Sequence, residues 1–202
     1  MKTEILVITD RSGSMGSIAD DVIGGFNRFL KDQKRQPGDA RITYTQFDGE
    51  YQVVYTARNI QQVEELNHST FVPRGSTALF DAIGRTLNEQ GKRIKDEAWA
   101  ELVVVCIITD GEENASKEYS KSRVREMVSH AEANGWKFLF LAANQDAFAA
   151  SRDFGSSAKY SGNFAANSAG VAMAYQSTSV TLSALRSGQN PDKLLMTTNT
   201  NP

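Results

Sequence analysis

The sequence predicts an α/β fold in which a doubly wound, mostly parallel sheet carries helices on both faces. Strand-like runs that are apolar on both sides occur at residues 4–9, 101–109 and 136–142, as is typical of parallel strands covered on each face. Amphipathic helical patterns lie between these runs. The pair Asp48-Gly49 separates two further strand-like runs, which predicts a hairpin and therefore one antiparallel edge strand.

The predicted helices follow the strands in order. Apolar residues recur at helical spacing over residues 18–30, and this pattern ends before Pro37-Gly38. The same spacing recurs over residues 79–94 and over residues 124–131, where Asn134-Gly135 provides a stop signal. The two strands of the hairpin are the runs RITYTQF and YQVVYT. Strands and helices therefore alternate along most of the chain, as a doubly wound sheet requires.

The pattern weakens after Asn144. We expect a short helix over residues 145–154, a short edge strand over 157–160 and a helix whose apolar stripe spans 164–185. The predicted domain covers residues 1–186, and residues 187–202 are expected to form a flexible C-terminal tail, because turn residues are frequent there and periodicity is weak.

Composition sets bounds on the function. The 202 residues suffice for one domain that buries roughly 70% of its unfolded surface. Lys and Arg number 22 against 24 Asp and Glu, a balance that indicates neither nucleic acid nor a membrane as partner. Acids interrupt the N-terminal apolar run, unlike in a signal peptide. We therefore expect a cytoplasmic protein, and Cys106, the single cysteine, is expected to be a buried and inert thiol.

Three segments rich in side-chain oxygen stand at matching places in the predicted fold. Asp10, Ser12 and Ser14 alternate after the first strand, Thr77 precedes the second helix, and Asp110 follows the strand 101–109. Ligands of open α/β sheets bind outside the carboxyl ends of the strands. We therefore expect these side chains to meet at one edge of the sheet.

Such a set of donors favours a hard cation. Mg²⁺ prefers oxygen ligands, with Mn²⁺ or Ca²⁺ as alternatives. Zinc is disfavoured, because His68 and His130 lie in unrelated segments and there is one cysteine. Two carboxylates would neutralise a dication and leave it able to attract one further anion.

The motifs DRSGSM, GSTALFDA and IITDGEEN together resemble those of the von Willebrand factor type A domain. In that family the metal-ion-dependent adhesion site, or MIDAS, is written Asp-x-Ser-x-Ser with a distant Thr and a distant Asp. Each member has a match here: Asp10, Ser12, Ser14, Thr77 and Asp110. The element order is similar over roughly residues 3–185, most closely to short stand-alone A domains of bacteria and phages.

The resemblance implies a Rossmann-like fold and a function. In such domains both serines bind Mg²⁺ directly, the aspartates act directly or through water, the threonine binds directly when ligand is present, and the open position accepts a Glu or Asp of a partner protein. For the partner-binding rim we expect Arg11 and Arg74, as exposed charges that steer an acidic ligand, together with Glu112 and Asp146.

Simpler interpretations exist for most of these residues. Asp10, Ser12 or Thr77 could cap a helix, a role worth about 1 kcal/mol. Asp81 fits a first-turn acid that complements the helix dipole, and Asp48, Glu112 and Glu113 fit solvated loop acids. Taken together in order, however, the three segments favour metal binding.

We therefore expect a Mg²⁺-dependent protein-binding module and not an enzyme. Within that class, the domain could serve as an adaptor for a hexameric ATPase of the MoxR type or for another assembly. One alternative is a metal-dependent hydrolase or phosphatase. Dehalogenase-like phosphatases need a second carboxylate two residues after the first, where this chain has Ser12. Another alternative is a structural component whose metal ion only holds the loops together. The sequence specifies neither the partner nor the oligomeric state.

Overall fold

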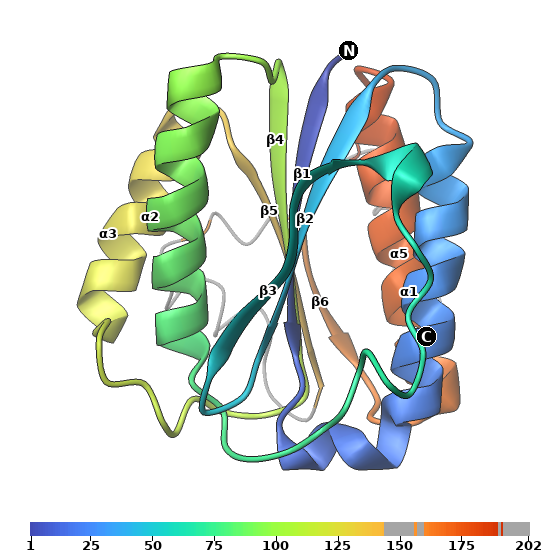
Figure 1. Ribbon diagram of the computed structural model, residues 1–202, viewed down its shortest axis with the longest axis vertical. Coiled ribbons are helices and arrows are strands. Elements are labelled where there is room, and N and C mark those ends of the chain that lie inside the picture. The colour runs from blue at the N-terminus through green and yellow to red at the C-terminus, as the bar shows by residue number, and fades with distance from the viewer. Residues whose placement is uncertain (144–155, 157–159, 190, 192–202) are drawn as a thin grey trace, which may run out of the picture.

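A six-stranded sheet lies between two layers of helices in the computed structural model, which describes residues 1–143, 156, 160–189 and 191 (Figure 1). The sheet has the order β3-β2-β1-β4-β5-β6. Only β3 runs antiparallel to its neighbour within the described sheet. The strands are β1 (Thr3–Asp10), β2 (Ala40–Phe47), β3 (Tyr51–Asn59), β4 (Leu102–Thr109), β5 (Lys137–Ala143) and β6 (Tyr160–Phe164). The predicted fold class is confirmed.

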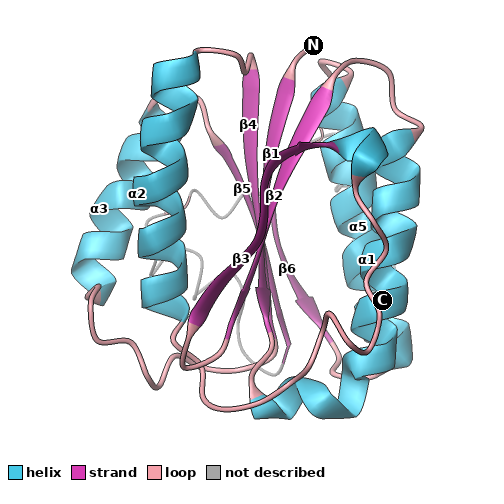
Figure 2. Cartoon of the chain, in the orientation of Figure 1, coloured by secondary structure: helices cyan, strands magenta, loops and turns pink. Residues whose placement is uncertain are grey.

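The helices divide between the two faces of the sheet. One face is covered by α1 and α5, and the other by α2 and α3 (Figure 2). Short 3₁₀ turns, η1 (Gly13–Ile18) and η2 (Ile60–Gln62), precede α1 and follow β3. The bounds are α1 (Ala19–Lys34), α2 (Leu79–Glu97), α3 (Lys121–Ala133) and α5 (Ser168–Arg186). None of the described helices is long and apolar enough to cross a bilayer.

The last described elements differ from the prediction in their bounds. The helix expected over 164–185 begins at Ser168, because the Asn167 side chain accepts a hydrogen bond from Gly170 N at 2.9 Å and caps the helix there. Phe164 belongs to β6, which pairs with β5 and starts at Tyr160. The expected helix over 145–154 lies outside the described residues, as does most of the expected tail.

Strand β1 is the centre of the core, and all eight of its residues are buried. Ile5 and Val7 pack with the residues of α1 and α5, whereas Leu6 and Ile8 pack with those of α2 and α3. This alternation follows from the two-residue period of a strand. Cys106 of neighbouring β4 is also buried, and burial raises the pKa of its thiol to about 12, which is the inert state expected from the sequence.

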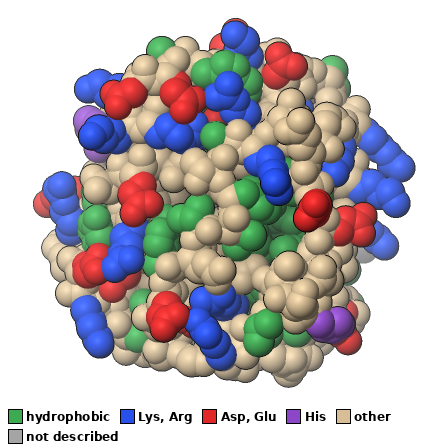
Figure 3. All heavy atoms as spheres, in the orientation of Figure 1, with side chains coloured by type: hydrophobic (Ala, Val, Ile, Leu, Met, Phe, Trp, Pro, Cys, Tyr) green, Lys and Arg blue, Asp and Glu red, His purple; other side chains and the backbone are tan. Residues whose placement is uncertain are grey.

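The helices α1 and α5 approach each other closely. A side chain at position 25 would overlap the ring of Tyr175, so only glycine fits there. Further along the seam, buried Gln33 donates to Ser179 O at 3.0 Å, and buried Arg186 donates to Gln33 O at 2.7 Å. The face that is turned to the viewer in Figure 1, with β3 at its front, shows acidic and basic side chains interspersed (Figure 3).

Two neighbouring glycines of α1 give a matched pair for testing this contact. Gly25→Ala is expected to destabilise the protein by about 1–3 kcal/mol, because its Cβ would push against the Tyr175 ring. Gly24→Ala is expected to stabilise it by about 0.5–1 kcal/mol, since nothing lies within 4 Å of the added carbon and alanine favours a helix. Urea denaturation measures both, and equal shifts would contradict the close approach.

Candidate metal centre

Sheet topology brings the predicted site residues to one edge. Asp10 is the last residue of β1, and Asp110 follows β4, which pairs in parallel with β1. The loop before α2 lies against both segments. Its backbone is fixed by hydrogen bonds from Gly13 N to Gly75 O at 3.1 Å, and from Asn114 N to Thr77 O at 3.0 Å. The three segments are therefore joined by direct protein hydrogen bonds.

The side-chain oxygens of the five predicted ligands converge beside Gly111. Ser14 Oγ lies 3.1 Å from Ser12 Oγ and donates to Asp110 Oδ1 at 2.8 Å. A methyl group placed on Gly111 would lie 3.3 Å from Thr77 Oγ1, 3.8 Å from Ser14 Oγ and 4.0 Å from Asp10 Oδ2. Glycine at this position thus leaves open a space that oxygens from all three segments line.

Both carboxylates are desolvated. Burial, with a smaller contribution from the charge of Asp110, raises the pKa of Asp10 to about 6, although the hydrogen bonds from the Thr109 hydroxyl and Ser12 N act to lower it. Burial also raises the pKa of Asp110, against the hydrogen bond from the Ser14 hydroxyl. Two neighbouring buried carboxylates are costly to keep ionised unless a cation accompanies them.

The donor set fits a hard divalent ion. Its five members offer two carboxylates and three hydroxyls, all oxygen donors of the kind that Mg²⁺, Mn²⁺ and Ca²⁺ accept. Within the part of the chain that the structure describes, no group of three or more His, Cys, Asp or Glu side chains is placed to hold a metal. An ion here would therefore depend on the hydroxyls of Ser12, Ser14 and Thr77 as well as on the two acids.

Helix capping does not account for the hydroxyls. Ser12 stands at the N-cap of η1 and Ala78 at the N-cap of α2, and neither helix end has a side-chain cap hydrogen bond. Asp10 stabilises the turn that follows β1, because its Oδ1 accepts a hydrogen bond from Ser12 N at 2.6 Å. Its Oδ2 accepts from Thr109 Oγ1 at 2.6 Å. Thr109 is not among the residues predicted for the site from the sequence, although it immediately precedes Asp110.

The prediction that Arg11 is an exposed charge on the partner-binding rim is wrong. Its side chain is 7% exposed, because Arg11 Nε forms an ion pair with Asp48 Oδ2 at 3.0 Å and the guanidinium also donates to Gln46 and Gln52. Asp48, expected as a solvated loop acid, is buried as well. Arg74 binds the same carboxylate at 2.9 Å but remains 54% exposed.

The Asp48 carboxylate is held ionised by these partners. Burial alone would raise its pKa, but the hydrogen bonds from Arg74 and Glu50 N and the positive charge of Arg11 together hold the pKa below its usual range. The hairpin between β2 and β3 is thereby tied to the loop after β1. Arg11 N also donates to Phe47 O at 2.7 Å, and Ala78 N to Asp48 O at 2.9 Å.

The loop after β4 is fixed in a similar way. Glu113, expected as a solvated acid, accepts from Ser116 N at 2.7 Å and from Phe80 N, in the first turn of α2, at 3.0 Å. Asp81, expected to complement the helix dipole, accepts hydrogen bonds from three backbone N–H groups, those of Lys117, Glu118 and Tyr119. Glu112 is exposed beside the site, and Asp146 lies outside the described residues.

Comparison with known proteins identifies the fold. No protein-family model matches the sequence, and no curated protein does. Among solved structures, proximal thread matrix protein 1 of the mussel byssus with a zinc-occupied MIDAS motif is similar, with a TM-score of 0.63 and 13% identity over 90% of this chain. The match covers 46% of the mussel chain, so this chain spans about half its length.

Two further structures agree. The vWF domain of the type V pili tip protein Mfa5 from Porphyromonas gingivalis has a TM-score of 0.62 and 12% identity, over 89% of this chain and 94% of that one. Manganese-loaded TRAP protein of Plasmodium vivax has a TM-score of 0.51 and 15% identity, over 85% and 72%. At these identities the likeness establishes the fold, which is that of von Willebrand factor type A domains.

The buried arginine cluster yields a stability prediction. Asp48→Asn is expected to destabilise the protein by about 2–4 kcal/mol, because it leaves the buried Arg11 charge without its carboxylate. Glu50→Gln, which changes the 75% exposed partner of Arg74, is expected to stay within about 0.5 kcal/mol of wild type. Chemical denaturation compares the two, and a mild effect of Asp48→Asn would mean that the amides of Gln46 and Gln52 suffice for Arg11.

Proposed function

We propose that this chain is a divalent-metal-dependent protein-binding module. The edge of the sheet that carries the five predicted ligands, here called the metal edge, would accept an acidic side chain of a partner protein. The observation that carries the proposal is the convergence of oxygens from three separate segments on the space beside Gly111. The ion-holding residues in the proposal are Asp10, Ser12, Ser14, Thr77 and Asp110. Mg²⁺ is the proposed ion, with Mn²⁺ and Ca²⁺ as alternatives.

The residues of the edge have separate tasks in this proposal. A bound divalent ion supplies a Lewis-acidic position to which an incoming carboxylate binds. Asp10 and Asp110 neutralise the ion, while the hydroxyls add ligands without adding charge. Ser14 is exposed whereas Asp10 is buried, so the open side toward a partner is the side of Ser14. The hydrogen bonds between loops hold the donors in place and so lower the entropy cost of binding.

Other functions have less support. Direct hydrogen bonds between protein groups join the three loops. The loops therefore do not need a purely structural ion to hold them together. A hydrolase would need a base that is free to act on water. His68 pairs with Asp20 at 3.3 Å, and His130 lies on α3, so neither belongs to the metal edge. The proposal therefore includes no catalytic step.

The setting of the proposed function comes from the sequence resemblance. Similar short A domains of bacteria and phages suggest a cytoplasmic module that serves a larger assembly, for example a hexameric ATPase. Zinc in the MIDAS of the mussel protein and manganese in the Plasmodium protein are reported for those proteins. They support a divalent ion here without selecting one.

Neighbouring hydroxyls allow a direct test of metal binding. Thr77→Ala is expected to weaken binding of Mg²⁺ or Mn²⁺ in calorimetry by roughly tenfold or more. Mutating a residue that only hydrogen-bonds to a metal ligand already lowers metal affinity by about that much, and Thr77 is itself a proposed ligand. Ser76→Ala is the control, since Ser76 is exposed and Thr77 is buried toward Gly111. Circular dichroism checks that both variants fold. Wild-type affinity in Thr77→Ala and in Ser14→Ala would refute the proposed ligand set.

Binding of the ion is also expected to stabilise the fold. At a hundredfold excess over the dissociation constant, Mn²⁺ should add about 2.7 kcal/mol to the free energy of unfolding, since only the folded chain brings the ligands together. Asp10→Asn should lose this increment while remaining folded without metal. A Mn²⁺-induced shift of equal size in Asp10→Asn would assign the stabilisation to another place on the molecule.

A further inference from the structure

Thr77 differs from the two acidic ligands of the proposed site in what holds it in place. Asp10 ends β1 and Asp110 directly follows β4, so the sheet itself positions both acids. Thr77 instead lies in the loop before α2, where Ala78 is the N-cap and makes no side-chain cap hydrogen bond. The position of Thr77 must therefore come from contacts with another part of the chain.

Asn114, in the loop after β4, holds Thr77 through both of its backbone groups. Asn114 Oδ1 accepts a hydrogen bond from Thr77 N at 3.0 Å, and Asn114 N donates to Thr77 O at 3.0 Å. Ala115 N donates to the same carbonyl at 3.2 Å. Because the main chain is fixed on both sides of the Thr77 Cα, the direction of its Cα–Cβ bond is fixed as well. A threonine side chain then has few rotamers left, and Thr77 Oγ1 lies beside Gly111.

The same loop also supports the start of α2 at places that do not touch the proposed ligand. Glu113 Oε2 accepts a hydrogen bond from Phe80 N at 3.0 Å, and Ser116 Oγ accepts one from Asp81 N at 3.0 Å. These bonds satisfy N–H groups that the first turn of a helix leaves without partners. The loop therefore has a general stabilising role, carried by Glu113 and Ser116, in addition to its contact with the proposed ligand.

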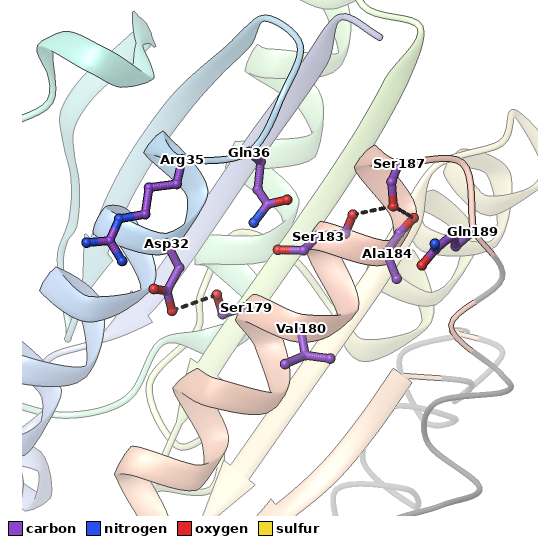
Figure 4. A pocket seen from close by; sticks show the side chains of 9 residues that line it. All are labelled: Asp32, Arg35, Gln36, Ser179, Val180, Ser183, Ala184, Ser187 and Gln189. Atoms are coloured by element: carbon purple, nitrogen blue, oxygen red, sulfur yellow. Dashed lines mark hydrogen bonds between the residues drawn. The ribbon is translucent and has the colours of Figure 1, made fainter.

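Hydroxyls beside a carboxylate do not by themselves make an ion site. In a groove of about 450 Å³ between α1 and α5, Ser179 Oγ donates to Asp32 Oδ2 at 3.2 Å (Figure 4). Asp32 is the single acid among the described residues that line this groove, and Arg35 lines it as well. The positive charge of Arg35 disfavours a cation there. Asp32 is therefore a suitable control for unspecific binding of a metal to an acid beside hydroxyls.

We propose that Asn114 is a positioning residue of the metal edge, which presents the Thr77 hydroxyl to the ion by holding the Thr77 backbone. This inference rests on the proposed function, because it takes Thr77 as a ligand of the ion. Asn114 acts through Thr77 and is not itself a ligand. Residues that orient a metal ligand typically contribute roughly ten- to hundredfold to metal affinity. Asn114 is exposed, so a substitution there leaves no cavity in the core.

Calorimetry on the full chain with Mn²⁺ separates positioning from the stability of the loop. Asn114→Ala is expected to weaken Mn²⁺ binding by roughly tenfold. Ser116→Ala removes a hydrogen bond between the same loop and α2, and it is expected to bind Mn²⁺ like wild type. Urea denaturation of the metal-free protein should show a lowered midpoint for both variants. Asp32→Asn should keep wild-type affinity, which assigns the binding to the metal edge.

A double variant tests whether Asn114 acts through Thr77. If it does, Asn114→Ala has no further effect on affinity once the Thr77 hydroxyl is absent. Asn114→Ala combined with Thr77→Ala is therefore expected to bind Mn²⁺ as weakly as Thr77→Ala alone. If the two losses multiply instead, Asn114 contributes independently of Thr77 and the proposal is overturned.

Amide hydrogen exchange of the metal-free protein measures the contact itself. The Thr77 N–H is expected to exchange faster in Asn114→Ala than in wild type, because it loses its acceptor. Asn114→Asp keeps an oxygen at the same place, so it should preserve slow exchange at Thr77 and wild-type Mn²⁺ affinity. The charge that this variant adds is screened at high ionic strength, so the affinities of wild type and both variants are compared at roughly 0.5 M salt.

The outcomes distinguish this inference from the proposed function. If wild type binds no Mn²⁺, or if Thr77→Ala binds like wild type, the role of Thr77 as a ligand fails and the inference fails with it. If Thr77→Ala binds weakly but Asn114→Ala keeps wild-type affinity, the positioning role alone is refuted. Equal losses of affinity in Asn114→Ala and Ser116→Ala would also refute it, because the effect would then follow from the general stability of the loop.

Discussion

Two acidic side chains are brought together because β1 and β4 are adjacent parallel strands, and the rest of the metal edge depends on this pairing. Asp10 ends one strand and Asp110 follows the other. Both are buried, and burial raises the pKa of each. Hydrogen bonds from Thr109, Ser12 N and Ser14 stabilise the ionised forms only in part. An edge of this kind favours a cation, which relieves both the repulsion and the desolvation.

The surroundings of this pair are rigid for a separate reason. Arg11, which lies within the first motif, pairs with buried Asp48, and Arg74 binds the same carboxylate. Glu113 and Asp81 fix the loop after β4 through backbone N–H groups. The donors therefore gain their positions from acids that do not themselves line the site. Such support is what keeps a binding edge preorganised before any ligand arrives.

The sequence sufficed to predict what depends on local pattern and strand order. Apolar runs, helical spacing and the Asp48-Gly49 turn predicted the sheet and its antiparallel edge, and three motifs predicted which oxygens would meet. It did not reveal pairings between distant residues. Arg11 and Asp48 are 37 positions apart, and as single residues both resemble solvated charges. Likewise, Asn167 as a helix cap sets the start of α5, whereas the apolar stripe alone placed it at Phe164.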